Sequence, residues 1–156
     1  MTKRFRVLAI VVALVGCTPP APPQPVKPKQ AIAALATVQG RFFGGDVAFG
    51  LLPKSAVDAS VLRQVAAFEE AVVPTLVDCL ADTSHSQVEY EGRATSLGAV
   101  CFWTLLQTRF VQDRLRQDRG KRPTPDLWVS YDAIKPGQQR HAQAEWRAWL
   151  ARPAQK

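Results

Sequence analysis

Apolar residues recur at helical spacing through most of the chain beyond residue 30, and this spacing predicts helices. Ala31–Phe43 is expected to form a short helix broken at Gly40, followed by an irregular, glycine-containing stretch that ends at Pro53. Ser55, with Asp58 three residues later, resembles a capping box and predicts the start of the next helix. The first half of this region is therefore expected to be helical with one irregular interruption.

The second half of the region also favours helices. Pro74 suits a first helical position, so it either kinks the preceding helix or opens another over Pro74–Ala81. Leu97–Leu115 is the strongest predicted helix, because it is apolar almost all the way round over most of its length, as in an element buried on more than one side. Pro136–Ala151 is expected to be the final helix, and its apolar stripe consists of Ala142, Trp146, Trp149 and Leu150.

Two segments interrupt this helical pattern. Gln87–Thr95 alternates weakly around Glu91 and Gly92, which predicts a small hairpin or an ordered loop. Leu127–Ile134 is expected to be extended. The expected fold class is therefore mainly α, a small helical bundle with one short hairpin or ordered loop.

The N-terminus has the pattern of a secretory signal peptide. Met1–Arg6 is basic, Val7–Val15 is uninterrupted and apolar, and small Gly16 follows. The nine apolar residues are too few to cross a bilayer as a helix, which takes about twenty. The run Leu14-Val15-Gly16-Cys17 resembles the lipobox of bacterial lipoprotein precursors.

The resemblance implies that Cys17 is lipidated and becomes the first residue of the mature protein. In Gram-negative lipoproteins an aspartate after this cysteine favours the inner membrane, so Thr18 implies the outer membrane. Several acyl chains on one residue give stable attachment. The alternative is an ordinary secretory signal that is cut elsewhere, with Cys17 incidental.

The chain is accordingly divided into three parts. Residues 1–16 are the expected signal peptide, and residues 17–30 are the lipidated cysteine with a tether that has six prolines in thirteen residues. Residues 31–156 are expected to form a single α-helical domain in the periplasm, since 126 residues suffice for one core.

A second resemblance concerns the domain itself. Residues 73–84 (VPTLVDCLADTS), 89–106 (EYEGRATSLGAVCFWTLL) and 141–150 (HAQAEWRAWL) are similar to segments of small HEAT-like helical proteins of bacteria. The resemblance implies stacked helical pairs and, by analogy, a protein-binding surface.

Apart from Cys17, the chain has two cysteines, Cys79 and Cys101. An even number of cysteines in an exported chain favours a disulfide, and the predicted reversal between their helices brings them toward each other. The alternative is a pair of reduced, buried cysteines that pack as small apolar residues.

Charge is distributed unevenly along the domain. Residues 31–108 have four basic and eight acidic side chains, whereas residues 109–156 have eleven basic and five acidic ones. Many of these cations cluster between Arg109 and Arg122, around a predicted helix C-terminus, where cations complement the helix dipole. The same cluster also suits contact with an anionic surface or an acidic partner. Nucleic acid is not an expected partner, because no basic motif with interleaved aromatic residues occurs.

Catalytic and metal motifs are largely missing, so no catalytic residue, metal site or cofactor is assigned. The chain contains no G-x-S-x-G elbow, H-E-x-x-H pair or Walker loop. His85 falls in a polar stretch, and His141 precedes Glu145 by one helical turn, the spacing of a surface ion pair. Trp103, Trp146 and Trp149 are expected in the core, whereas an envelope or cell-wall hydrolase stays an alternative that would use the histidines.

The expected function is an outer-membrane lipoprotein whose periplasmic domain is a non-catalytic protein-binding or assembly module of the cell envelope. By architectural analogy it resembles secretion-system pilotins and periplasmic immunity proteins that inhibit a toxin. The expected binding surface combines the predicted hairpin with the basic region, and its residues are Glu89, Tyr90, Arg93, Arg114, Arg119 and Arg122.

Overall fold

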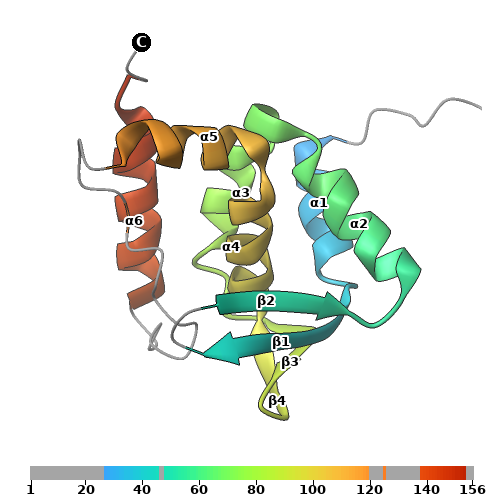
Figure 1. Cartoon of the computed structure of the whole chain (residues 1–156). Helices are drawn as coiled ribbons and strands as arrows, with labels where there is room; N and C mark the ends of the chain where they lie inside the picture. The colour runs from blue at the N-terminus through green and yellow to red at the C-terminus, as the bar shows by residue number, and fades with distance from the viewer. Residues whose placement is uncertain (1–26, 46–47, 120–124, 126–137, 154–156) are drawn as a thin grey trace, which may run out of the picture.

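Helices form one layer of the molecule and a sheet forms the other (Figure 1). The structure, a computed structural model, describes residues 27–45, 48–119, 125 and 138–153. The expected signal peptide, Cys17, most of the expected tether, Arg122 and Leu127–Ile134 lie outside these residues. The described elements are α1 (Pro28–Leu35), β1 (Gln39–Gly45), β2 (Ala48–Pro53), α2 (Ala56–Ala66), η1 (Glu69–Ala71), α3 (Val73–Cys79), β3 (His85–Tyr90), β4 (Arg93–Ser96), α4 (Leu97–Gln107), α5 (Arg109–Asp118) and α6 (Gln138–Ala151).

The prediction of a mainly α fold was wrong, because the described residues form a mixed α/β structure with a four-stranded sheet. The HEAT-like arrangement of stacked helical pairs is therefore also wrong. Residues 39–43, expected to end a helix, lie in β1, and the stretch expected to be irregular forms β2. Gly40 fits this pairing, since a Cβ there would lie 2.5 Å from the Leu52 carbonyl oxygen. Gly40, which would weaken a helix, thus allows β1 and β2 to approach closely.

The strand order is β2-β1-β3-β4, with β1 antiparallel to β2 and parallel to β3, and with β3 antiparallel to β4. The β3–β4 hairpin confirms the prediction for Gln87–Thr95. Its turn residues, Glu91 and Gly92, have φ of 50° and 76°, as in the turns that favour two-residue hairpins. Alternation directs Phe42, Leu51 and Val88 toward the helices, where they are buried.

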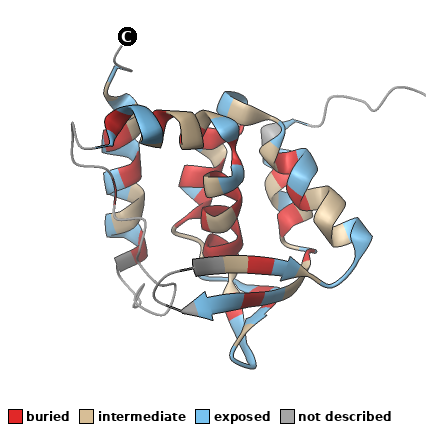
Figure 2. Cartoon of the chain, in the orientation of Figure 1, coloured by how far each residue is buried: buried red, intermediate tan, exposed pale blue. Residues whose placement is uncertain are grey.

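Helices α3 and α4 hold the centre of the core, and Figure 2 shows buried residues concentrated there. The Cys79 and Cys101 sulfurs are 2.02 Å apart, a disulfide that joins these two helices as expected. A bridge across a sequence separation of 22 residues stabilises by about 3 kcal/mol in the chain-entropy model. Trp146 and Trp149 are buried, which confirms their core assignment, whereas Trp103 is half-buried against the core.

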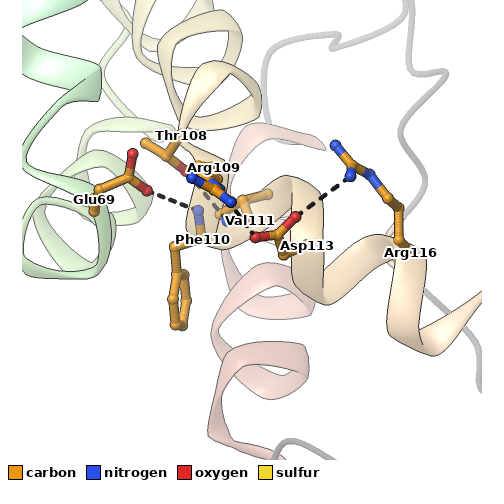
Figure 3. Close-up of polar contacts among 7 residues, drawn as sticks. All are labelled: Glu69, Thr108, Arg109, Phe110, Val111, Asp113 and Arg116. Atoms are coloured by element: carbon orange, nitrogen blue, oxygen red, sulfur yellow. Dashed lines mark hydrogen bonds and ion pairs between the residues drawn. The ribbon is translucent and has the colours of Figure 1, made fainter.

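The segment predicted as one long helix, Leu97–Leu115, is two helices that meet at Thr108. Thr108 has ψ of 132°, and its hydroxyl accepts a hydrogen bond from the Val111 N–H, so it caps α5. The Glu69 carboxylate, in η1, accepts the Phe110 N–H at 2.8 Å (Figure 3). The side chains of Thr108 and Glu69 thus accept hydrogen bonds from two N–H groups of the first turn of α5, which in a continuous helix would have bonded to carbonyls of the preceding turn.

The predicted starts of α2 and α3 and the predicted final helix are confirmed. Ser55 is the N-cap of α2, Pro74 lies in the first turn of α3, and α6 runs over Gln138–Ala151. Within the described residues, no helix is both long and apolar enough to cross a membrane.

Asp58 connects the start of α2 to the start of β1. The Gln39 N–H donates to its carboxylate at 2.9 Å, and the Ser55 hydroxyl donates to it as well. These hydrogen bonds, that of Gln39 foremost, hold the pKa of Asp58 below its ordinary value of 3.8. Folding therefore favours the ionised carboxylate.

We expect Asp58→Asn to lower the free energy of unfolding at neutral pH, because asparagine cannot carry this charge. A depressed folded-state pKa stabilises the fold above the unfolded value and loses this effect as the pH falls through the folded value. The difference between wild type and variant should thus shrink as the pH drops below 3.8. Urea denaturation from neutral pH to about pH 2.5 measures it. A difference that stays constant with pH would contradict this role of the charge.

Candidate functional site

The face of the sheet that points away from the helices carries the exposed side chains of β1, β2 and β3. Arg41 lies opposite Leu52 on one side and opposite Glu89 on the other, so the three form a row across the sheet. Phe43 is 52% exposed and Leu52 48% exposed, although both are large and apolar. We call this surface the open face.

A hollow of about 600 Å³ lies on the open face. The alternation that buries Phe42, Leu51 and Val88 turns the neighbours of these residues outward into the hollow. At one end of the hollow, the Lys54 ammonium donates a hydrogen bond to the Gln39 side-chain oxygen at 3.0 Å. The lining residues are Gln39, Gly40, Arg41, Leu52, Pro53, Lys54, Gln87 and Glu89.

Phe43 extends the apolar part of the open face along β1. It lies opposite Gly50, and a Cβ on Gly50 would lie 2.5 Å from the Phe43 ring. The ring therefore covers the glycine, and the absence of a side chain at position 50 leaves room for it. An exposed aromatic and an exposed leucine flanked by charges are typical of surfaces that contact another protein.

Of the residues expected in the hairpin, Glu89 lies in the hollow on the open face. Arg93 is exposed on β4, opposite Tyr90. Tyr90 is half-buried and packs against the core. The hairpin thus contributes to the open face chiefly through Glu89.

Arg114 is not part of an exposed binding surface, and its assignment to one was wrong. It is 9% exposed, and its guanidinium donates to the Trp149 carbonyl at 2.9 Å and to the Arg152 carbonyl. The same group lies 4.9 Å from the centre of the Trp149 ring. Trp149 in turn donates its ring N–H to Asp118 at 2.8 Å. The arginine therefore holds the C-terminal end of α6 against α5.

Of the other cations in the basic region, Arg109 and Arg116 lie on α5 and Arg119 follows it, at the end of the helix layer away from the sheet (Figure 1), whereas Lys121 and Arg122 lie outside the described residues. Arg109 and Arg116 both pair with Asp113 at 3.5 Å (Figure 3). Arg119 is exposed at the end of α5. Among the residues that the structure describes, the hairpin and the basic region therefore do not form one surface.

The two histidines lie on different elements, His85 exposed on β3 and His141 on α6. His141 lies 3.3 Å from Glu145, which confirms the expected i,i+4 pair. In the described ranges, no group of three or more His, Cys, Asp or Glu side chains is placed to hold a metal ion.

Comparison with known proteins adds no relative. No protein-family model, curated protein or solved structure matches this chain. The function is therefore argued from the surface of this chain alone.

The sequence reasoning missed Arg41, Phe43 and Leu52. Each of these residues belongs to a strand that was expected to be helical or irregular. The signal that was present is a pair of short apolar runs, Phe42-Phe43 and Leu51-Leu52, bounded by glycine or proline.

Proposed function

We propose that this protein is a lipid-anchored, non-catalytic binding module of the bacterial cell envelope, and that its domain binds another protein through the open face. The observation that carries the proposal is the exposure of Phe43 and Leu52 beside Arg41 and Glu89 on a sheet face that no described helix covers. Apolar anchors within a charged surround favour protein contact, because the anchors gain from desolvation while the charges select the partner.

The anchor rests on the lipobox-like run that ends at Cys17. Helix α1 begins at Pro28, so 27 − 17 = 10 residues separate the lipidated residue from the fold. Ten residues span at most about 35 Å when fully extended. The domain is then held close to the outer membrane, on its periplasmic side.

Figure 1 supports an orientation for this anchored domain. Helix α1 begins at the end of the helix layer that lies away from the sheet and runs toward β1. The point of attachment and the open face are thus at opposite ends of the molecule. A partner reaches Phe43 and Leu52 without crossing the membrane surface.

The cysteine pair also supports an exported location. Disulfides persist in the oxidising periplasm and are rare in the cytosol. Cys79 and Cys101 lie at disulfide distance inside the core. The cysteine pair thus supports export independently of the pattern at the N-terminus.

The proposal is tested by placing an aspartate in the open face. We expect Leu52→Asp to reduce in-cell crosslinking to the partner at least about tenfold, because the aspartate removes an apolar anchor and its carboxylate lies opposite Arg41, whose charge would otherwise face the partner. The measurement is chemical crosslinking of the tagged, membrane-bound protein, followed by identification of the captured protein.

Val57→Asp is the matched control. Val57 is an apolar residue on α2 that is 72% exposed and lies outside the hollow of the open face. We expect this variant to capture the same protein as the wild type, and both variants to keep the thermal transition of the wild type. Equal capture by the two aspartate variants would show that the open face is not the binding surface.

A further inference from the structure

Strand β2 is one of the two edge strands of the sheet, and no strand of the described residues pairs with its outer side. The Lys54 N–H donates to the Gln39 carbonyl at 2.9 Å, which identifies this position as a hydrogen-bonded pair of the antiparallel ladder. Because bonded and non-bonded pairs alternate, the next bonded pair is Arg41 with Leu52. The backbone N–H and C=O of Leu51 therefore point away from β1, toward the free edge.

The free edge separates two hollows. The hollow of the open face reaches it at Leu52, Pro53 and Lys54. A second hollow of about 530 Å³ lies on the helix side of the sheet, and Pro53 lines both. Its lining is mainly apolar and comprises Leu51, Pro53, Ala59, Leu62, Arg63, Ala66, Ala67, Glu69, Trp103 and Gln107.

The charges near this edge are also unequal on the two sides. On the open face, the strands nearest the edge carry Arg41 and Lys54, whereas the carboxylate of Glu89 lies one strand further away, on β3. On the helix side, the hollow carries one cation, Arg63, and one carboxylate, Glu69, which already accepts the Phe110 amide, and the other lining residues are mainly apolar. A strand beside β2 would thus meet two cations on the open face and a mainly apolar hollow with one cation on the helix side.

We propose that the β2 edge binds an extended segment of the partner protein, which adds a fifth strand to the sheet and alternates apolar with acidic residues. Successive side chains of a strand point to opposite faces, so the apolar ones enter the helix-side hollow near Leu62 and Trp103. The acidic ones lie over the open face near Arg41 and Lys54. This inference rests on the proposed function and names the chemistry of the partner at that site.

Pro53 limits the length of the pairing, because it has no N–H to donate. The segment pairs instead with the backbone groups between Ala48 and Leu52. Main-chain hydrogen bonds then supply affinity, and the two hollows supply selectivity for alternate side chains.

The test uses a synthetic peptide, acetyl-Thr-Glu-Val-Glu-Leu-Glu-Val-Thr-amide, added to the processed full-length protein labelled with ¹⁵N in detergent micelles. We expect the Leu51 N–H to exchange with solvent at least about tenfold more slowly when the peptide is bound. The Leu52 N–H, which already pairs with Arg41, serves as the internal control and should not change. A peptide in which lysine replaces each glutamate should bind at least about tenfold more weakly.

Two N-methylated peptides test the backbone pairing itself. One is methylated on its apolar residues and the other on its glutamates, so only one of them keeps the N–H groups that face β2. We expect one peptide to lose at least about tenfold in affinity and the other to bind like the parent. If the peptide methylated on its apolar residues loses affinity, the pairing is antiparallel, because Leu51 then exchanges both backbone hydrogen bonds with the apolar residue that faces it. If the peptide methylated on its glutamates loses affinity, the pairing is parallel, because Leu51 then bonds to the glutamates on either side of that apolar residue.

The inference is wrong if the parent peptide does not bind at millimolar concentration, if the Leu51 amide is unchanged on binding, or if both methylated peptides bind like the parent. These outcomes leave the proposed function standing as long as Leu52→Asp reduces in-cell capture at least about tenfold and Val57→Asp does not. Equal capture by those two variants contradicts the proposed function itself.

Discussion

Arg114→Ala is expected to lower the free energy of unfolding by about 3 kcal/mol. The guanidinium donates to the carbonyls of Trp149 and Arg152 at the end of α6 and lies over the Trp149 ring. Alanine would remove the side-chain donor to both carbonyls, leaving the Arg152 N–H as the donor to the Trp149 carbonyl, and would leave a void beside the tryptophan. Urea denaturation, followed by tryptophan fluorescence, measures the loss.

Arg116→Ala is the matched control for this prediction. Arg116 belongs to the same helix, but its side chain is 72% exposed and its pair with Asp113 is 3.5 Å long. We expect its removal to change stability by less than about 0.5 kcal/mol, as for other surface ion pairs. Similar losses in the two variants would show that Arg114 does not hold α6 against α5.

Cys17→Ser is expected to abolish lipid labelling and to leave an unprocessed precursor. Lipidation forms a thioether, and a serine hydroxyl lacks the thiolate that this step needs. Metabolic labelling with an alkyne fatty acid, together with fractionation of membranes, measures both effects.

The other two cysteines provide the control for lipidation. The double variant Cys79→Ser, Cys101→Ser removes the disulfide pair and keeps Cys17, so its labelling should persist. If the Cys17→Ser protein were processed and attached like the wild type, the anchor would lie elsewhere and the lipoprotein proposal would be wrong.

Local patterns predicted the elements that local interactions determine. Ser55 caps α2 through a contact three residues away, Pro74 lies in the first turn of α3, and the Glu91-Gly92 turn joins the strands of the β3–β4 hairpin. The Cys79–Cys101 pair followed from a reversal between adjacent helices. The cap, the proline and the turn depend on residues close together in the sequence, whereas the cysteine pair spans 22 residues and was expected also from the even number of cysteines.

Non-local pairing explains what the sequence did not show. Strand β1 joins β3 in parallel, with Gln39 opposite Gln87, 87 − 39 = 48 residues further along. No periodicity within residues 31–43 reports such a partner, and the apolar spacing there also fits a helix. The capping of α5 by Glu69, 41 residues away from Phe110, is equally invisible to a local pattern.

The same limit applies to the candidate site. Glu89 was assigned to a binding surface because its turn was recognisable, whereas Arg41, Phe43 and Leu52 become neighbours only once β1 has paired on both sides. Arg114 was assigned to the surface from its charge, yet its carbonyl partners lie 35 and 38 residues away, on and just beyond α6. Charge clustering in the sequence does not distinguish an exposed arginine from one that caps a distant helix.

The most direct test of the central claim, that the open face binds an envelope protein, is site-specific photo-crosslinking in living cells. A photoreactive amino acid replaces Leu52 in one strain and Val57 in another, since both positions are exposed and apolar but only Leu52 lies in the hollow of the open face. We expect position 52 to yield a single recurrent crosslinked protein that is absent at position 57. Identical crosslinking patterns at the two positions, or no adduct at position 52, would contradict the claim.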